Sequence, residues 1–399
     1  MKLKLLLGGV KMLNNNNFNG ERLKSARIYR GVTIMELADK IGVSKQMVSK
    51  YENNKSIPAF ETMLKIIDFL DFPKSYFFEE DIVQTKVGNT YFRALFSTSK
   101  KDQLMQNDRI KFLSIIRQFL EKYIDFPELD LPELNDSELL EIETVSKQLR
   151  EYWELGEEPI PNMVRLLEKK GFIVASANTN SSTIDAFNQK QEIQGNDYYF
   201  VVLGNDKGSA VRRQFDAAHE LGHIILHDPY IDLADLDKDQ FREIEREAND
   251  FAAAFLLPEE AFRKDIINHP VDLENYLYLK RKWKVSVSAM TVRAYKIGAI
   301  TQSQYQYLQR KIVQKNWRKS EPLDDTMTPA TPLAMKKAIE LLIDNNVLSG
   351  DGIVKELSKE YNLSLYPHEI ERLLNLKSGL LSPQSVEAEN IVNIKDYLK

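Results

Sequence analysis

The sequence predicts an α+β protein that is mostly helical, with one small β-sheet in its middle third. Three observations lead to this prediction. Helical periodicity runs through most of the 399 residues. Clear β-rich runs bounded by Gly and Asn occur only at 172–175 and 198–203, with 184–187 as a third candidate strand. Two histidines, His219 and His223, stand four residues apart in the helical stretch that follows these runs. We expect an antiparallel sheet beside a helix that bears these histidines.

The composition restricts the chemistry that is available. A hydrophobic content of 43% and a charged content of 28% are ordinary for a soluble globular protein. The net charge of −5 means that nucleic acid would have to bind a local basic patch. The chain has no cysteine, which excludes disulfides, thiolate zinc sites and cysteine nucleophiles. A metal ion here would have to bind His, Asp or Glu.

No apolar run approaches the roughly 18 residues that a membrane span requires. The basic and apolar start, residues 1–12, is followed by Asn14–Asn17 and not by a small-residue cleavage site. We therefore expect a frayed tail over residues 1–19, or a translation start at Met12. Both interpretations predict a cytoplasmic protein that does not contact a membrane.

A helix-turn-helix unit is predicted within residues 20–80. Thr33 begins the first helix of the pair, and Glu36, three residues later, completes a capping box. Gly42 makes the turn and Ser44 caps a second helix that ends near Glu52. Two short helices joined by a glycine-containing turn are typical of this DNA-binding motif. A further helix is expected over 60–70.

The second helix of the pair is predicted to enter the major groove of double-stranded DNA. Its exposed positions and its C-terminal end supply polar and basic side chains that can contact bases or phosphates. These are Lys45, Gln46, Ser49, Lys50, Asn53 and Lys55. From Glu21 to Lys55 there are eight Lys or Arg and four Asp or Glu, a local charge of +4. We expect Glu52 to pair with Arg27. The alternative is a small helical bundle used for dimerisation.

The stretch Ala218-His-Glu-Leu-Gly-His223 carries the strongest chemical signal. On a helix, His219 and His223 lie on one face one turn apart, where both imidazoles can bind one metal ion. Glu220 lies beside them, where it can act on a water molecule. The alternative is a helix with a few hydrogen-bonded histidines. The apolar neighbours favour the metal, because a buried His-Glu-His group needs a partner to offset desolvation.

A third ligand is expected from the next helix, 241–257, which stops at Pro258. Glu245 and Glu247 flank its apolar stripe at similar angles, so periodicity alone cannot choose between them. Asn249 favours Glu245, because it lies four residues further on the same side and can hydrogen-bond a ligand histidine. We expect Glu247 and His227 to lie next to the metal ligands without binding the metal ion themselves. His269 and His368 are predicted to be structural or surface residues.

The remaining organisation follows from proline-punctuated and acidic segments. We expect a helical connector with an acidic linker at 81–137, a metal-binding domain at 138–320 and a second linker at 321–332. Residues 333–399 are predicted to form a helical domain with helices at 335–345, 352–361, 367–374 and 385–398. The helical pair near 279–300 is interpreted as packing, not as a second DNA-reading unit.

The N-terminal unit resembles the Xre family of phage-repressor-like regulators. The resemblance rests on Leu23-Lys-Ser-Ala-Arg27, Glu36-Leu-Ala38, Gly42-Val-Ser44, Val48-Ser-Lys-Tyr-Glu52 and Pro58. It implies operator binding, usually as a homodimer across a palindrome.

Residues from about 145 to 320 resemble the ImmA/IrrE metallo-endopeptidases. The shared motifs include Arg213-Gln-Phe-Asp-Ala-Ala-His-Glu-Leu-Gly-His223, Glu247-Ala-Asn-Asp-Phe-Ala-Ala253, Leu256-Leu-Pro258 and Lys280-Arg-Lys-Trp283. The resemblance implies a zincin-like domain with Zn²⁺, and the spacing of Glu245 and Asn249 is similar to the third-ligand helix of Glu-zincin peptidases. Members of this family act in the bacterial cytoplasm and on mobile elements, where they typically inactivate a helix-turn-helix repressor.

The sequence therefore predicts a DNA-binding transcription regulator with a zinc endopeptidase domain. Glu220 would be the general base, and the substrate would be a protein, by resemblance a repressor. One alternative is a regulator whose zinc domain is only a sensor or a structural module. A third hypothesis is a zinc hydrolase of a non-peptide amide.

Overall fold

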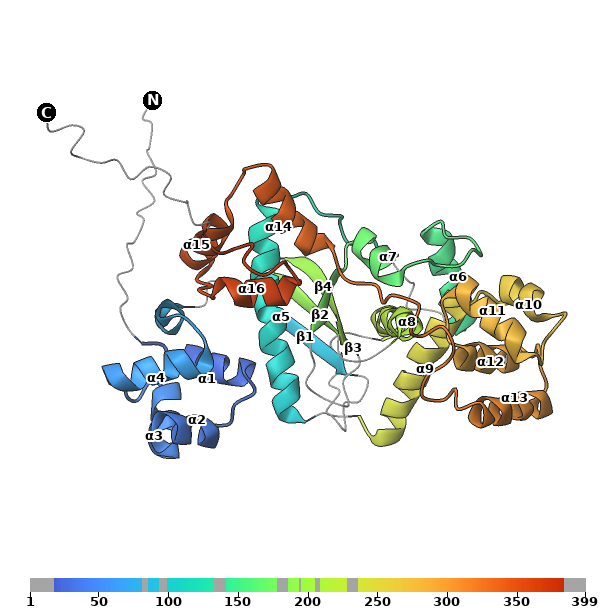
Figure 1. Cartoon of the computed structure of the whole chain (residues 1–399), viewed down its shortest axis with the longest axis horizontal. Helices are drawn as coiled ribbons and strands as arrows, with labels where there is room; N and C mark the ends of the chain where they lie inside the picture. Colours follow the sequence, from blue (N-terminus) through green and yellow to red (C-terminus); the bar gives the residue numbers. More distant parts are fainter. Residues whose placement is uncertain are drawn as a thin grey trace, which may run out of the picture.

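The computed structural model describes residues 18–80, 85–92, 99–132, 141–177, 186–193, 195–204, 209–227 and 236–383. In this part the chain is mostly helical and surrounds one four-stranded sheet, so the predicted α+β class is confirmed (Figure 1). The predicted helix at 385–398 and the tail up to residue 17 lie outside the described residues. No helix in the described ranges is long and apolar enough to cross a membrane.

The N-terminal unit has the helix-turn-helix arrangement that the sequence predicts. Its elements are α1 (Gly20–Tyr29), α2 (Ile34–Ile41), α3 (Lys45–Glu52), α4 (Phe60–Leu70) and the 3-10 helix η1 (Lys74–Phe78). Thr33 and Glu36 form both bonds of the capping box, and Gly42 takes a left-handed conformation with φ of 76° between α2 and α3. The buried Arg27 Nε donates to Glu52 Oε1 at 2.5 Å, which confirms the predicted ion pair.

The sheet has the strand order β1-β3-β4-β2. The strands are β1 (Thr85–Phe92), β2 (Ile173–Ala177), β3 (Ala186–Ile193) and β4 (Asn196–Gly204). The expectation of an antiparallel sheet is only partly right: β3 pairs antiparallel with β4 and β1, but β2 pairs parallel with β4. The tight β3–β4 hairpin places β3 on one side of β4, so β2 joins β4 on the other side.

Strand β1 corrects the expectation that residues 81–137 form a helical connector. Gly88 and Asn89 interrupt its alternation, which hides the strand from a periodicity argument. The structure accommodates them as a bulge, because the register with β3 shifts between Val87 and Thr90. The same region also contains a long helix, α5 (Lys100–Glu121), which agrees with the helical part of that expectation.

Helices cover both faces of the sheet (Figure 1). Side chains alternate between the faces along each strand. Ile173, Ala175, Phe187, Phe200 and Val202 pack into one hydrophobic core with α5, the helix-turn-helix unit and the C-terminal helices. Val174, Ala186, Tyr199, Val201 and Leu203 pack into a second core with the helices of residues 142–314. The sheet is therefore the boundary between the two cores.

The second core contains α6 (Ile142–Tyr152), α7 (Met163–Lys169), α8 (Ala210–Leu226) and α9 (Lys238–Leu256). It extends into α10 (Glu259–Ile266), α11 (Leu273–Trp283), α12 (Val287–Lys296) and α13 (Gln302–Gln314).

The segment before α6, which the sequence predicts to be a linker, packs against this region over its described part. A Cβ at Gly171, where φ is +82°, would lie 2.2 Å from the Glu128 carbonyl oxygen, so glycine is needed there.

The C-terminal helices are α14 (Ala334–Asp344), α15 (Gly350–Tyr361) and α16 (Pro367–Leu374). They share the first core with the helix-turn-helix unit. Polar contacts also join the two regions: the Arg22 guanidinium donates to the Asn362 carbonyl at 2.9 Å, and Arg30 Nη1 lies 2.7 Å from Glu369 Oε2. The DNA-binding unit is thus fastened to the rest of the chain through these helices.

Candidate functional site

The two histidines of the His-Glu-x-x-His motif lie on the buried side of α8. His219, Glu220 and His223 are each 0% exposed. Gly222, within the motif, faces α9: a Cβ at this position would lie 3.0 Å from the Ala248 carbonyl oxygen. The glycine therefore lets α8 and α9 approach closely, which brings the α9 carboxylates to the level of the histidines.

Glu245 of α9 completes a group of three donor residues with the histidines. The Nε2 atoms of His219 and His223 are 3.0 Å apart. Glu245 Oε2 lies 3.5 Å from His219 Nε2, and Glu245 Oε1 lies 3.3 Å from His223 Nε2. Burial raises the pKa of Glu245, but hydrogen bonds to the two histidines outweigh it and lower that pKa to about 2. The carboxylate is therefore ionised.

This donor set fits a zinc ion. Zinc binds imidazole nitrogen and carboxylate oxygen at about 2.0–2.2 Å, so the edges of its coordination tetrahedron measure about 3.3–3.6 Å. The two distances from Glu245, one from each carboxylate oxygen, match such an edge at 3.5 Å and 3.3 Å, and the distance of 3.0 Å between the two Nε2 atoms is slightly shorter. Three protein ligands with two neutral nitrogens and one carboxylate are typical of catalytic zinc, which keeps a fourth position for water or substrate.

Glu220, next to His219 on α8, contacts strand β3 of the sheet. Asn188 Nδ2, on strand β3, donates to Glu220 Oε2 at 2.7 Å, and Asn188 is 2% exposed. This amide fixes the orientation of the carboxylate. The sequence analysis did not identify Asn188. The available signal was the polar run Asn188-Gln-Lys-Gln191, which is unusual inside a strand whose ends are apolar.

His227 and Glu247 form a hydrogen-bonded chain that starts at His223. His227 is the C-cap residue of α8. Its Nδ1 atom lies 3.1 Å from His223 Nδ1, and its Nε2 atom lies 3.1 Å from Glu247 Oε2. Burial, followed by the charge of His223, lowers the pKa of His227 to about 4, so its ring is neutral at pH 7.

The protons along this chain have one consistent arrangement. Glu247 can only accept, so His227 Nε2 carries its proton and His227 Nδ1 accepts from His223 Nδ1. The lone pair of His223 is then on Nε2, the atom that faces His219 and Glu245. His227 and Glu247 thus select the tautomer that a metal requires.

The structure separates the residues that the sequence could not rank. It brings Glu245, and not Glu247, to the two histidines. Asn249 departs from expectation: its Nδ2 donates to the Glu245 backbone carbonyl at 2.6 Å and not to a histidine. Its amide lies close enough to its own helix to bond the carbonyl four residues back. His269 is exposed, and the exposed His368 lies 2.9 Å from Asp71.

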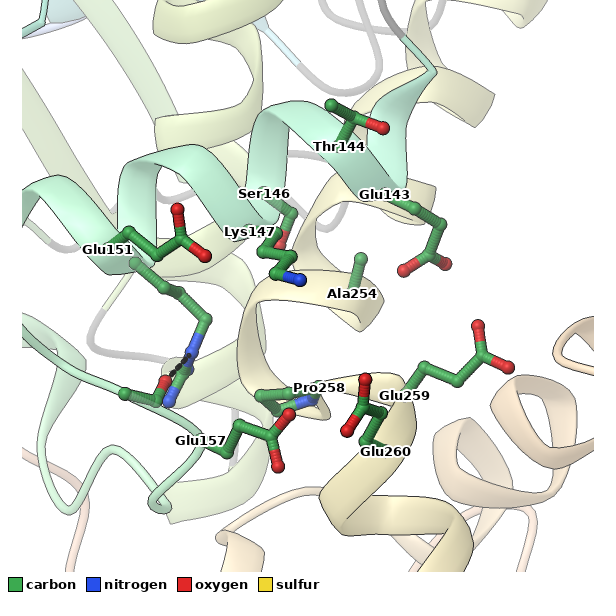
Figure 2. A pocket seen from close by; sticks show the side chains of 12 residues that line it. Glu143, Thr144, Ser146, Lys147, Glu151, Glu157, Ala254, Pro258, Glu259 and Glu260 are labelled. Atoms are coloured by element: carbon green, nitrogen blue, oxygen red, sulfur yellow. Dashed lines mark hydrogen bonds between the residues drawn. The ribbon is translucent and has the colours of Figure 1, made fainter.

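A cavity of about 430 Å³ lies away from these residues, between α6 and the junction of α9 with α10 (Figure 2). Carboxylates dominate its walls, but several are already neutralised. Glu143 pairs with Arg293, and Glu259 pairs with Arg263 at 2.6 Å. None of the predicted site residues lines it. We therefore do not assign the chemistry of the chain to this cavity.

The predicted DNA-contacting side chains gather on and after α3, at the end of the helix-turn-helix unit remote from α16 (Figure 1). Lys45, Gln46, Lys50, Asn53 and Lys55 are exposed and Ser49 is half-buried. Among the described residues, no ion pair engages the three lysines. Asn53 Nδ2 is used within the helix, where it donates to the Ser49 carbonyl at 2.7 Å.

The fold and the two groups of residues define a helix-turn-helix unit joined to a metallopeptidase-type domain. Comparison with protein families agrees. Residues 23–77 match the helix-turn-helix family, and residues 167–295 match a peptidase family described as an IrrE N-terminal-like domain. No curated protein matches the chain significantly. The chain therefore fuses an Xre-like DNA-binding domain to an ImmA/IrrE-like metallopeptidase domain.

Proposed function

We propose that this DNA-binding regulator is also a zinc endopeptidase that hydrolyses a peptide bond in another regulatory protein. The observation that carries the proposal is the arrangement of His219, His223 and Glu245 around one point, with Glu220 oriented beside them. A domain that only stores zinc has no need for a buried carboxylate next to the ligands. The geometry supports hydrolysis better than storage.

The residues of the chain have separate roles in the proposed reaction. His219, His223 and Glu245 would hold the zinc ion, which when bound supplies Lewis-acid chemistry that acidifies water and polarises a carbonyl. Glu220, held by Asn188, takes a proton from the attacking water on its carboxylate. It then delivers that proton to the nitrogen of the departing amine as the carbon–nitrogen bond breaks. His227 and Glu247 hold His223 in its binding tautomer.

On the DNA side, we propose that α3 reads an operator in the major groove, with a homodimer spanning two half-sites. Its lysines and Gln46 are exposed to reach bases and phosphates. A role at DNA supports the expectation of a cytoplasmic protein. Binding at an operator would bring the peptidase near DNA-bound regulators, which are therefore the favoured substrate class.

One observation supports a second candidate function. The complete burial of His219, Glu220 and His223 suits a zinc domain that senses or stabilises and does not cut. In that case the chain is a transcription regulator without peptidase activity.

Replacing Glu220 by Gln separates the two functions. We expect Glu220→Gln to abolish cleavage and to leave zinc and DNA binding intact, because only the proton-transfer group is lost. The measurement is a comparison of new protein N-termini in cells that carry the wild type or the variant. Fragments that appear only with the wild type support the peptidase. Identical fragment sets under all conditions, including DNA damage, favour the sensor.

The DNA assignment has its own test. Lys50→Ala should weaken binding to DNA selected from a random library by about 1–3 kcal/mol, without changing zinc content. Lys24→Ala is the matched control, because Lys24 is an exposed lysine on α1 that pairs with Glu21 and lies outside α3. Equal effects of the two variants would show that α3 is not the reading helix.

A further inference from the structure

Strand β3 is the strand that adjoins the proposed catalytic residues. Asn188, on β3, contacts Glu220. The opposite edge of the sheet is β2, which lines a small cavity together with Pro332, Met335 and residues of α16. An extended substrate that adds to this sheet beside the proposed metal ligands would therefore pair with the side of β3 that does not face β4.

That side of β3 is already occupied by β1. The two strands pair antiparallel over residues 85–92 and 187–193. Tyr91 is the register partner of Asn188, and Phe92 is the partner of Phe187. The backbone of β1 thus lies directly beside the residue that orients Glu220, in the place that an extended peptide would take.

The middle of β3 is polar on both faces of the sheet. Asn188, Gln189 and Gln191 are at most 3% exposed, although amides are uncommon in the interior of a strand. Gln189 and Gln191 lie on the face of α5, where Gln191 Nε2 donates to Gln189 Oε1 at 2.9 Å and Gln189 Nε2 donates to Asn107 Oδ1 at 3.2 Å. Asn188 lies on the opposite face, where it contacts Glu220, so it is the amide of β3 that belongs to the proposed site.

The pairing of β1 is weaker than that of the central strands β3 and β4. It pairs with one neighbour only, and Gly88 and Asn89 interrupt its ladder as a bulge. By contrast, β3 and β4 pair over eight consecutive residue pairs. Opening β1 therefore disrupts fewer interactions than opening any central strand.

We propose that β1 is an internal inhibitor that occupies the substrate-strand position of β3. The substrate is an extended segment of a protein, which pairs antiparallel with β3 after β1 has left. This inference rests on the proposed peptidase function. Because β1 lies between the helix-turn-helix unit, which ends at residue 80, and α5, events at the DNA-binding unit have a direct covalent route to the strand.

A reversible disulfide between β1 and β3 tests this proposal. Lys86 and Glu192 are register partners, and opposite residues in antiparallel strands lie at Cα separations that a disulfide spans. Because the chain contains no other cysteine, Lys86→Cys with Glu192→Cys gives a single disulfide. The zinc-loaded full-length chain is assayed with fluorescein-labelled casein as an unfolded protein probe, before and after reduction by a phosphine.

We expect the oxidised lock to cleave casein at least tenfold more slowly than the reduced form. The matched control is Glu192→Cys with Asp197→Cys, which joins the same position to β4 and should show no such difference. Equal rates for the oxidised and reduced lock would overturn the proposal while leaving the peptidase intact. If no form cleaves casein or a cellular protein, the proposed function fails instead, and the inhibitor falls with it.

A measurement without cleavage gives an independent check. In the Glu220→Gln background, a labelled peptide with the sequence of Thr85–Phe92 should bind the reduced lock at least tenfold more tightly than the oxidised lock. Hydrogen exchange should show that this peptide protects β3 amides. Equal binding to both forms would show that the peptide does not compete for the edge of β3, and would overturn the proposal.

Discussion

Two groups of His and carboxylate side chains in this molecule bring their donor atoms close together but have opposite surroundings. His219, His223 and Glu245 bring their donor atoms within 4.8 Å of one another, and so do Asp71, His368 and Glu369. In the first group, Glu245 has only histidines as ion-pair partners among the described residues. In the second group, arginines already neutralise the carboxylates.

The second group is a clasp between the DNA-binding unit and the C-terminal helices. Glu369 is almost completely buried and accepts hydrogen bonds from Tyr29, Arg30 and Arg372. Arg30 also donates to Asp71 at 3.0 Å. Burial raises the pKa of Glu369, but the charge of Arg30 and the bonds to Tyr29 and Arg372 outweigh it, so the pKa is lowered. The comparison teaches that neighbouring cations distinguish an ionic clasp from a candidate metal centre.

Removing Glu369 should produce the largest effect. We expect Glu369→Ala to lower the free energy of unfolding by about 3–5 kcal/mol, because it leaves Arg30 and Arg372 near a buried interface without their carboxylate. Zinc content should not change. Urea unfolding measures the stability. His368→Ala is the control and should cost about 0–1 kcal/mol, because its pair with Asp71 is exposed. Equal losses in the two variants would contradict the clasp.

Removing His227, which contacts the proposed metal ligand His223, should have an intermediate effect. His227→Ala should weaken zinc binding by about 10–100-fold, because His223 loses the partner that fixes its tautomer. Competition with a chromophoric chelator measures the affinity. Glu247→Gln keeps an acceptor oxygen for His227 and should have a smaller effect. Unchanged affinity in His227→Ala would mean that the proton arrangement is set elsewhere.

Acid should weaken the clasp, and this is the smallest expected effect. A carboxyl group whose folded pKa is lowered contributes stability above its ordinary pKa, and this contribution is lost as the pH falls through the folded value. The ordinary pKa of Glu369 is 4.5, so the contribution is complete near neutrality and decreases below about pH 4.5. We expect the stability difference between the wild type and Glu369→Gln to shrink from pH 6 to pH 3. A difference independent of pH would show that the charge of Glu369 is unimportant.

The sequence predicted the parts of the molecule that depend on local spacing. The helix-turn-helix caps at Thr33 and Ser44 follow from short-range hydrogen bonding, and the structure contains both. The placement of His219 and His223 on one face follows from the helical repeat. The choice between Glu245 and Glu247 did not follow, because both flank the apolar stripe and only the packing of α8 on α9 decides which one faces the histidines.

Other features depend on contacts between distant parts of the chain. Tyr29 and Glu369 are 340 residues apart, so no local pattern links them. Strand β1 lacks a regular alternation because of Gly88 and Asn89, and its partner β3 is polar where a buried strand is usually apolar. The sequence analysis also did not identify Asn188, because its role follows only from the approach of β3 to α8.

The most direct test of the account is the zinc content of three purified proteins: the wild type, Glu245→Ala and Asp71→Ala. The account predicts about one zinc per chain in the wild type and in Asp71→Ala, and a loss of zinc in Glu245→Ala, because one of three protein ligands is removed. Zinc retained in Glu245→Ala, or lost in Asp71→Ala, would contradict the assignment of the metal to His219, His223 and Glu245.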